Sequence, residues 1–475
     1  MGSVTKKGRL LSIQIINKRK ISEPPLMEYD DYINYSEMIS YLGYFNLIKK
    51  LDLVLTPTNE LSLYIGNCEF LNVNYLINYL LNQTSMSIKL NESIFAGGKG
   101  FSMYKAICSS LGEAFERLVG CLEFFLRKDQ LIKGSYIELV TKGYSCVNPK
   151  QLQLFSREQL EEDNFLFDPF DEDTVASWVE VNDYISGEKL LFPAVILLMF
   201  YRPQLKDEGR IGYATSGGLT SHYRKELGIE HGIQEILERN EINLCWYTNR
   251  QPKEIVLNDI RHPLLKEYKD HIDENGIKFY LHNVDQENFH VVTAKSFDED
   301  LTKYAFNTGG GISNDIEKAV LASLEEYSQS VSNTRKIVYA PEWITSKFSN
   351  YVLNVNEGDD PKKFKTFYQS VSYYGLKANR NKLDWYVKNN SKINLSEIRD
   401  KQEKLSVEQF IEKEKIRPII MEHEMSKQFK HIFISKTYLL EYTPAFISGT
   451  PAFGHEKYQK YLGNGTLNPS ILPYP

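Results

Sequence analysis

The sequence predicts an α/β fold, that is, a mixed α+β fold in which strands and helices alternate. Strand-like stretches recur at Trp178–Ile185, Lys189–Phe192 and Ala194–Phe200. Segments with apolar residues at helical spacing lie on both sides of them, and each of three such segments follows a cluster of glycines. Alternating strands and helices favour helices packed on sheets.

The bulk composition is that of a globular protein with a sizeable core. The chain has 475 residues, of which 42% are hydrophobic and 25% charged. At roughly 150 residues per domain this suggests about two or three domains. We expect a small N-terminal domain at residues 1–90, which would bind a peptide or a partner, and a larger one at 91–475. In the small domain we expect strands at Leu51–Leu55 and Leu61–Ile65 and a short helix at Leu76–Leu81.

Charge and cysteine content exclude several classes of protein. The net charge is −6 and no long block of like charges occurs, so neither nucleic acid nor an anionic membrane is expected as a partner. The five cysteines are odd in number and lack a CxxC spacing, which favours a reducing cytoplasm. The longest apolar stretch, Leu190–Tyr201, is shorter than the roughly 20 residues of a spanning helix and predicts a buried strand.

Three segments repeat one design: Phe95–Arg127, Tyr213–Arg239 and Asn307–Gln329. Each begins with adjacent glycines and then enters a helix. We expect the glycines to form turns from which backbone N–H groups approach phosphate oxygens. Ser102 is the expected N-cap of the first helix, and Asn314 with Glu317 forms the expected capping arrangement of the third. The glycines are Gly97 and Gly98, Gly217 and Gly218, and Gly309 to Gly311.

Each helix carries a polar stripe with steps of four and then three residues, which places its members on one face. Converging carboxylates are costly to bury unless a cation lies between them, and Mg²⁺ prefers oxygen ligands. The pattern therefore predicts a magnesium–phosphate site among these glutamates, with Lys99 adding positive charge. The stripes are Ser109, Glu113, Glu116 and Arg117; His231, Glu235, Glu238 and Arg239; and Ala322, Glu326 and Gln329.

A single ExxER would more often be a solvated face with a salt bridge, but three glycine–helix–ExxE/Q units are hard to obtain by chance. His231 alone is expected to be a buried, satisfied histidine rather than a catalytic base. For Ser109, a ligand role and a packing role stay open. The sequence has no GxxxxGK[ST] loop, no dinucleotide-binding fingerprint and no kinase signature, so the nucleotide site is an unusual one.

These elements resemble the YcaO-domain family over roughly residues 90–475. The resemblance is carried by GGKG at 97–100, Ser109-x3-Glu113-x2-Glu116-Arg117, Glu235-x2-Glu238-Arg239 and Glu326-x2-Gln329. It implies a non-P-loop site for ATP and Mg²⁺ in which glutamates hold the metal: Glu113, Glu116, Glu235, Glu238 and Glu326. Because five carboxylates exceed the usual need of Mg²⁺, a role for one or two of them in orienting the others or in binding a second ion stays open. The nucleotide contacts that the resemblance implies are Lys99, Ser109, Glu113, Glu116, Arg117, Glu235, Glu238, Arg239, Glu326 and Gln329.

The segments around Trp178–Tyr201 and after Glu238 are similar to the streptolysin-type, SagD-like cyclodehydratases of thiazole/oxazole-modified peptides. Their PxPxP tail reaches the active site, and this chain ends in two of those prolines, Pro473 and Pro475. The alternative is a disordered tail. The resemblance implies that the Pro475 carboxylate handles the amide proton, with Arg117 and Arg239 as phosphate partners. Departures from the family pattern occur at Asn240, Val331 and Ile471.

The implied reaction is ATP-dependent conversion of Cys, Ser or Thr in a ribosomal precursor peptide into thiazoline or oxazoline rings. The implied partners are that precursor with its leader and a ThiF-like leader-binding protein. A flavin dehydrogenase subunit and a homodimer are left open. The rival reactions are peptide thioamide or amidine formation, and the rival of another class is a non-catalytic peptide-binding scaffold.

Overall fold

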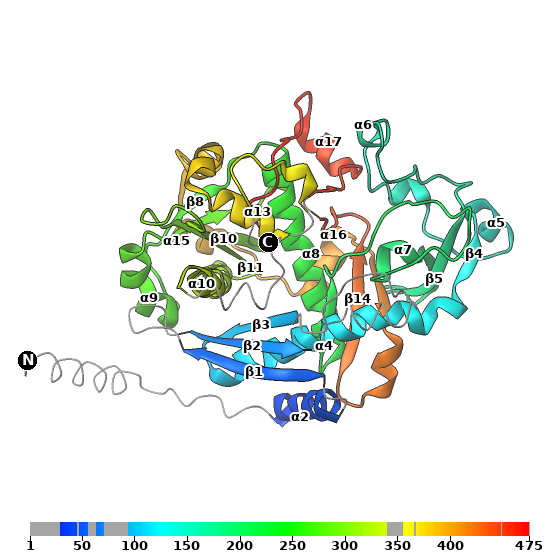
Figure 1. Cartoon of the computed structure of the whole chain (residues 1–475), viewed down its shortest axis with the longest axis horizontal. Coiled ribbons are helices and arrows are strands. Elements are labelled where there is room, and N and C mark those ends of the chain that lie inside the picture. Colours follow the sequence, from blue (N-terminus) through cyan, green and yellow to red (C-terminus); the bar gives the residue numbers. More distant parts are fainter. Residues whose placement is uncertain are drawn as a thin grey trace, which may run out of the picture.

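The computed structural model describes residues 29–44, 47–55, 63–70, 94–339, 355–364, 367–447 and 449–474. Within these residues the strands form three sheets, of three, five and six strands. Helices pack against each of the sheets, so the predicted mixed α+β class is confirmed (Figure 1).

The three-stranded sheet is antiparallel and lies at the lower edge of the molecule in Figure 1, where helix α2 (Tyr29–Tyr44) contacts α4. The predicted strand at Leu51–Leu55 is confirmed, the second strand begins at Tyr64, and the expected helix Leu76–Leu81 falls outside the described residues. Because β3 pairs with β2, the strand that carries the first glycine pair completes this sheet. Its elements are β1 (Ile48–Leu55), β2 (Tyr64–Phe70), β3 (Ile94–Gly100) and α4 (Met103–Arg127), which packs on β2 and β3.

The six-stranded sheet has the order β4-β5-β13-β14-β7, with β6 paired to β5. The predicted strands at Trp178–Ile185 and Lys189–Phe192 are confirmed as β5 and β6, but the expected strand Ala194–Phe200 is wrong. Short helix α7 (Ala194–Leu197) follows Pro193 instead, because a short buried apolar run suits either state. The elements are β4 (Ile132–Gly134), β5 (Ala176–Asp183), β6 (Lys189–Pro193), β7 (Leu219–His222), β13 (Pro418–Glu422), β14 (Phe433–Leu439) and α8 (Lys225–Tyr247), which packs on β7 and β14.

The five-stranded sheet has the order β11-β10-β9-β8-β12, antiparallel except for the parallel pair of β12 and β8. Helix α10 packs on β10 and β11 and shares a buried apolar cluster with α9. The elements are β8 (Lys253–Val256), α9 (Pro263–Glu274), β9 (Lys278–Leu281), β10 (His290–Phe297), β11 (Phe306–Ser313), α10 (Ile316–Tyr339), β12 (Lys392–Asn394) and α15 (Leu395–Lys401).

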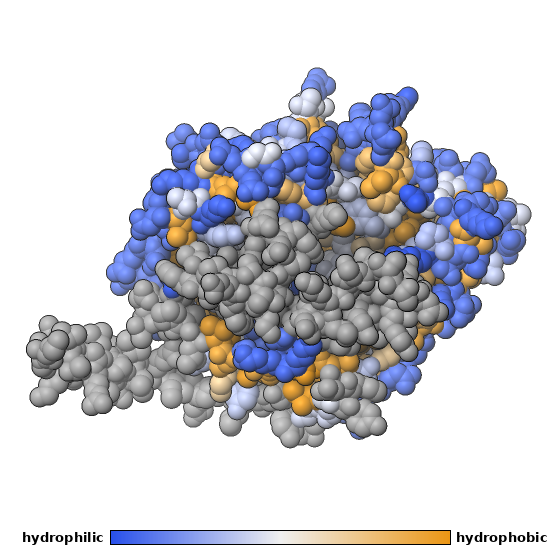
Figure 2. Space-filling model, viewed as in Figure 1, coloured by the Kyte–Doolittle hydropathy of each residue, from blue (hydrophilic) through white to orange (hydrophobic). Residues whose placement is uncertain are grey.

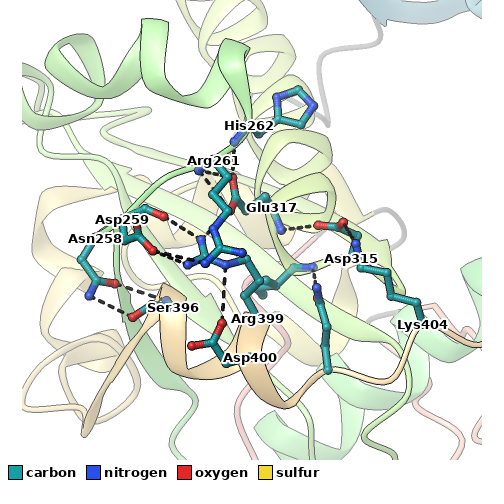
Figure 3. A network of polar contacts seen from close by, with 12 residues as sticks. Asn258, Asp259, Arg261, His262, Asp315, Glu317, Ser396, Arg399, Asp400 and Lys404 are labelled. Carbon is teal, nitrogen blue, oxygen red and sulfur yellow. Dashed lines mark hydrogen bonds and ion pairs between the residues drawn. The ribbon is translucent and has the colours of Figure 1, made fainter.

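The predicted helix starts are confirmed within a few residues, but only one of the two predicted N-caps is right. Ser102 caps α4 by accepting a hydrogen bond from the Lys105 N–H at 3.2 Å, as expected. The expected pairing of Asn314 with Glu317 is wrong: Asp315 accepts from the Glu317 N–H at 3.0 Å. Glu317 instead accepts from the backbone N–H groups of Arg261 and His262 and pairs with Arg399 (Figure 3). This carboxylate ties α10 to the loop before α9 and to α15.

The C-terminal tail is ordered through Tyr474, so the alternative of a disordered tail is wrong for these residues. Trp246 Nε1 of α8 donates to the Ser470 carbonyl at 2.8 Å, and the Tyr374 hydroxyl donates to the Ile471 carbonyl at 2.7 Å. Leu472 is 8% exposed in the same apolar cluster. Tyr374 lies on α13 (Phe367–Tyr374). Other helices in this part of the chain are α14 (Asp384–Val387), α16 (Val407–Glu414) and α17 (Glu456–Leu462).

No helix among the described residues is both long and apolar enough to cross a bilayer. Figure 2 shows hydrophilic residues over most of the described surface in view, with apolar residues in separate patches.

Candidate active site

The glycines of the three repeated segments make close strand–helix packing rather than three turns. Only Gly217 and Gly218 form a turn, where Gly218 has φ +77; the other clusters lie within β3 and β11. A Cβ on Gly98 would lie 2.1 Å from the Ala106 carbonyl of α4, and one on Gly309 would lie 2.0 Å from the Tyr327 nitrogen of α10. The expectation of three glycine turns is therefore wrong, because the missing side chains let each helix approach its strand.

The first glutamate of each ExxE/Q motif is held in the same way. One of its carboxylate oxygens accepts a hydrogen bond from a glycine N–H on the strand or turn before its helix. A charge-assisted bond of this kind fixes the carboxylate and leaves its second oxygen for another partner. The three pairs are Gly97 with Glu113 at 2.8 Å, Gly218 with Glu235 at 2.8 Å, and Gly310 with Glu326 at 2.7 Å.

The second residue of each motif faces the strand or turn of the next unit, so the three units close into a ring. Glu116 of α4 accepts from the Ser221 N–H on β7 at 2.7 Å. A Cβ on Gly310 of β11 would lie 2.9 Å from Glu238 Oε1 of α8, and one on Gly97 of β3 would lie 2.0 Å from Gln329 Nε2 of α10. The predicted stripe residues of three helices therefore meet around one centre.

Electrostatic interactions divide the five glutamates into two groups. Burial and the neighbouring carboxylates of Glu235 and Glu113 raise the pKa of Glu116 to about 8. Burial and Glu326 raise the pKa of Glu238 to about 7. Although burial opposes it, Lys99 and Arg239 hold the pKa of Glu326 below its usual range. The ionised forms of Glu116 and Glu238 would be stabilised by a cation placed between them and the neighbouring carboxylates.

The predicted cations lie among these carboxylates. Arg117 forms an ion pair with Glu113 on the same helix, and Lys99 Nζ lies 3.6 Å from Glu326 Oε1. Arg239 lies over the ring of Tyr474, 4.8 Å from its centroid. All three cations therefore lie beside the glutamates, as the binding of a magnesium-bound polyphosphate requires.

Tyr474 belongs to the site although the sequence reasoning did not identify it. Its hydroxyl lies 2.9 Å from Glu238 Oε1 and 2.9 Å from Glu326 Oε2. The side chain is 3% exposed, and Gly310 makes room for it, because a Cβ there would lie 2.1 Å from the hydroxyl oxygen. The available signal was the proline on each side of it. Pro475, the expected proton acceptor, lies outside the described residues.

Lys436 of β14 was also missed, and no local pattern marks it. Its ammonium donates to the Thr215 carbonyl at 2.6 Å and to the Gly217 carbonyl, which braces the turn that presents the Gly218 N–H to Glu235. The side chain is 3% exposed. Burial lowers its pKa to about 8, and Glu235 opposes that shift.

The structure also places three other residues that the sequence analysis discussed, His231, Ser109 and Asn240. His231 is exposed, so the expectation of a buried histidine is wrong. Ser109 is also exposed, one helical turn before Glu113, which argues against a packing role. Asn240 is buried and accepts from the Thr443 N–H at 3.0 Å, so the departure there supports the core instead of contacting the stripe.

The donor set fits Mg²⁺ together with a nucleotide. Among the described residues, no three His, Cys, Asp or Glu side chains are arranged to hold a metal ion by themselves. Mg²⁺ usually takes one or two carboxylates and completes its shell with phosphate oxygens and water. Four of the five glutamates have one oxygen anchored by a backbone N–H, and cations lie beside them, which suits that mode.

The chain matches the model of a known protein family. The family model described as YcaO cyclodehydratase, ATP- and Mg²⁺-binding, matches residues 97–406, more than half of the chain. No curated protein sequence matches the chain.

Solved structures share the fold at low sequence identity. A heterocyclase in complex with substrate and cofactor has a TM-score of 0.63 and 14% identity over 92% of this chain, which spans 57% of that protein. The E. coli microcin synthetase McbBCD complex has a TM-score of 0.58 and 13% identity, and the match covers 90% of this chain and 96% of that one. YcaO from Methanopyrus kandleri, bound with AMPPCP and Mg²⁺, has a TM-score of 0.54 and 14% identity. That match covers 86% of this chain and 90% of the other. The family match over residues 97–406 shows that this chain belongs to the YcaO family.

Proposed function

We propose that this protein is an ATP-dependent cyclodehydratase that converts Cys, Ser or Thr of a ribosomal precursor peptide into thiazoline or oxazoline rings. The observation that supports it most is the ring of anchored glutamates around which α4, α8 and α10 meet, with the tail residue Tyr474 inserted between two of them. A YcaO-family chain with this centre intact has the groups needed to position a polyphosphate.

The bound nucleotide with Mg²⁺ would supply the phosphoryl group that turns the amide oxygen into a leaving group. Glu113, Glu116 and Glu235 form one candidate metal-binding group, and Glu238 and Glu326 form the other. Phosphoryl transfer depends mainly on positioning and on neutralising charge. Positioning comes from the backbone N–H bonds to Glu113, Glu116, Glu235 and Glu326. Charge neutralisation comes from Lys99, Arg117 and Arg239. Ser109 and Gln329 complete the proposed nucleotide contacts.

The tail would bring the proton acceptor. Tyr474 is held by Arg239 on its ring and by two carboxylates at its hydroxyl. Pro475 follows it directly, so its carboxylate is proposed to take the amide proton as the ring forms.

A peptide substrate agrees with what is recorded for a similarly folded protein, since the McbBCD complex was also solved with pro-MccB17 bound. We extend this to a leader-bearing precursor and a ThiF-like leader-binding partner, with residues 1–90 as an alternative leader-binding part. A flavin dehydrogenase would act after this protein, and the cytoplasm is the proposed location.

The test is the mass of the precursor peptide after incubation with this protein, its leader-binding partner and Mg-ATP. Loss of one water per ring, coupled to release of ADP and phosphate, is the expected result. Replacement of oxygen by sulfur would assign a thioamide-forming reaction instead. If leader binding is verified but neither a mass change nor ATP turnover is found, the protein is a non-catalytic peptide-binding scaffold and the proposal is wrong.

A further inference from the structure

Lys295 is a buried cation that the nucleotide site does not use. It lies on β10, is 3% exposed, and pairs in register with Thr308 of β11 and Lys278 of β9. Its ammonium lies over two tyrosine rings, 4.3 Å from the centroid of Tyr386 and 5.0 Å from that of Tyr280. Burying an ammonium without an anion is costly, and aromatic faces return only part of that cost.

A pocket of about 250 Å³ opens at this lysine. Four cations and two anions line it, although the whole chain carries a net charge of −6. The glutamates, arginines and Lys99 of the nucleotide site are not among its lining residues. The charged residues at the pocket are Lys278, Lys295, Glu299, Arg380, Asp384 and Lys388.

The other cations at this pocket already have acidic partners. Lys278 pairs with Glu254 at 3.4 Å, Lys388 pairs with Asp384 at 2.9 Å, and Arg380 pairs with Glu299. Within the part of the chain that the structure describes, Lys295 has no carboxylate partner. The pocket is therefore lined by one buried lysine that lacks a carboxylate partner among the described residues.

We propose that this pocket binds a small oxyanion, a carboxylate or a phosphate, with the Lys295 ammonium as its counter-charge. The faces of Tyr280 and Tyr386 hold the ammonium in place. Burial lowers the pKa of Lys295 to about 7, so a bound anion would favour the charged amine. The site is independent of the proposed peptide chemistry.

Amine acetylation read by mass spectrometry tests the site on the wild-type protein without ATP or peptide. Inorganic phosphate and succinate are the two probes, and they distinguish a phosphate site from a carboxylate site. At ten times its Kd, the preferred anion should slow acetylation of Lys295 about tenfold, because only the free amine reacts. Lys99 in the same digest reports any binding of the anion at the nucleotide site. Unchanged acetylation of Lys295 with both anions would overturn the proposal.

Lys295→Met keeps a chain of similar length between the two rings and removes the charge. The anion that protects Lys295 should raise the Tm of the wild type and of Lys392→Met, an exposed lysine that does not line the pocket. It should not raise the Tm of Lys295→Met. An equal rise in Lys295→Met would assign the effect to another site and contradict the proposal; if that variant does not fold, the acetylation result on the wild type decides.

Discussion

The hydroxyl of Tyr474 lies 2.9 Å from Glu238 Oε1 on α8 and 2.9 Å from Glu326 Oε2 on α10. The penultimate residue of the chain thereby joins the second carboxylate of one unit to the first carboxylate of the next. A single hydroxyl proton is shared between two groups that otherwise repel each other, so the tail positions the carboxylates as well as filling space.

Tyr474→Phe should weaken catalysis without unfolding the protein. A hydrogen bond to a charged group contributes about 1.5–3 kcal/mol, so kcat/KM for ATP should fall at least about tenfold. ATPase kinetics measure this, with the Tm as a check on the fold. Tyr144→Phe removes an exposed hydroxyl and should leave both values unchanged. Wild-type kinetics in Tyr474→Phe would show that the hydroxyl only packs.

Gly310→Ala should displace Tyr474 from the site. The added Cβ would lie 2.1 Å from the Tyr474 hydroxyl oxygen and 2.7 Å from Cζ, distances that atoms do not tolerate. We expect a loss of activity that is not additive with Tyr474→Phe, as for residues in contact. A double-mutant cycle on kcat/KM measures the coupling.

Gly358→Ala is the matched control, because a Cβ there meets nothing within 4 Å. Independent, additive effects of Gly310→Ala and Tyr474→Phe would contradict the contact between strand β11 and the tail.

The polar stripes were predictable because helical spacing is local. Glu113 and Glu116, or Glu235 and Glu238, share a face wherever the helix lies. The contacts that complete the site are long-range. Tyr474 is 236 residues from Glu238 along the chain, and no periodicity connects them.

The glycines show a second limit. Gly97, Gly98 and Gly309 to Gly311 suggested turns, since glycine is common there. In the structure they allow a helix to approach a strand, and the distinction depends on α4 and α10 lying directly on β3 and β11. Lys436 had no sequence signal at all, because the carbonyls it binds belong to a turn some 220 residues away.

Stability should fall as pH drops below 6.5, in part through His423. This histidine is 2% exposed beside α4, and burial, with Arg127 and Lys436, lowers its pKa to about 3. The unfolded chain binds a proton near pH 6.5 that the folded chain binds only near 3, so the stabilisation is complete above 6.5 and is lost between those values.

Each pH unit in that window should cost about 1.4 kcal/mol from this group alone. Urea unfolding of the wild type and His423→Leu from pH 7 to 5 isolates it, since the carboxylates titrate in both proteins. The variant should show the shallower loss; equal slopes would mean that His423 takes up its proton in the folded state.

The central claim is that carboxylates from different helices jointly bind Mg²⁺ with the nucleotide. Calorimetric titration of Mg²⁺ and a non-hydrolysable ATP analogue into the wild type, Glu116→Ala and Glu238→Ala tests it without peptide or partner. Each substitution removes one member of a different carboxylate group. We predict binding to the wild type, loss of most of that affinity in both variants, and a retained fold by circular dichroism. Wild-type affinity in both folded variants would contradict the account.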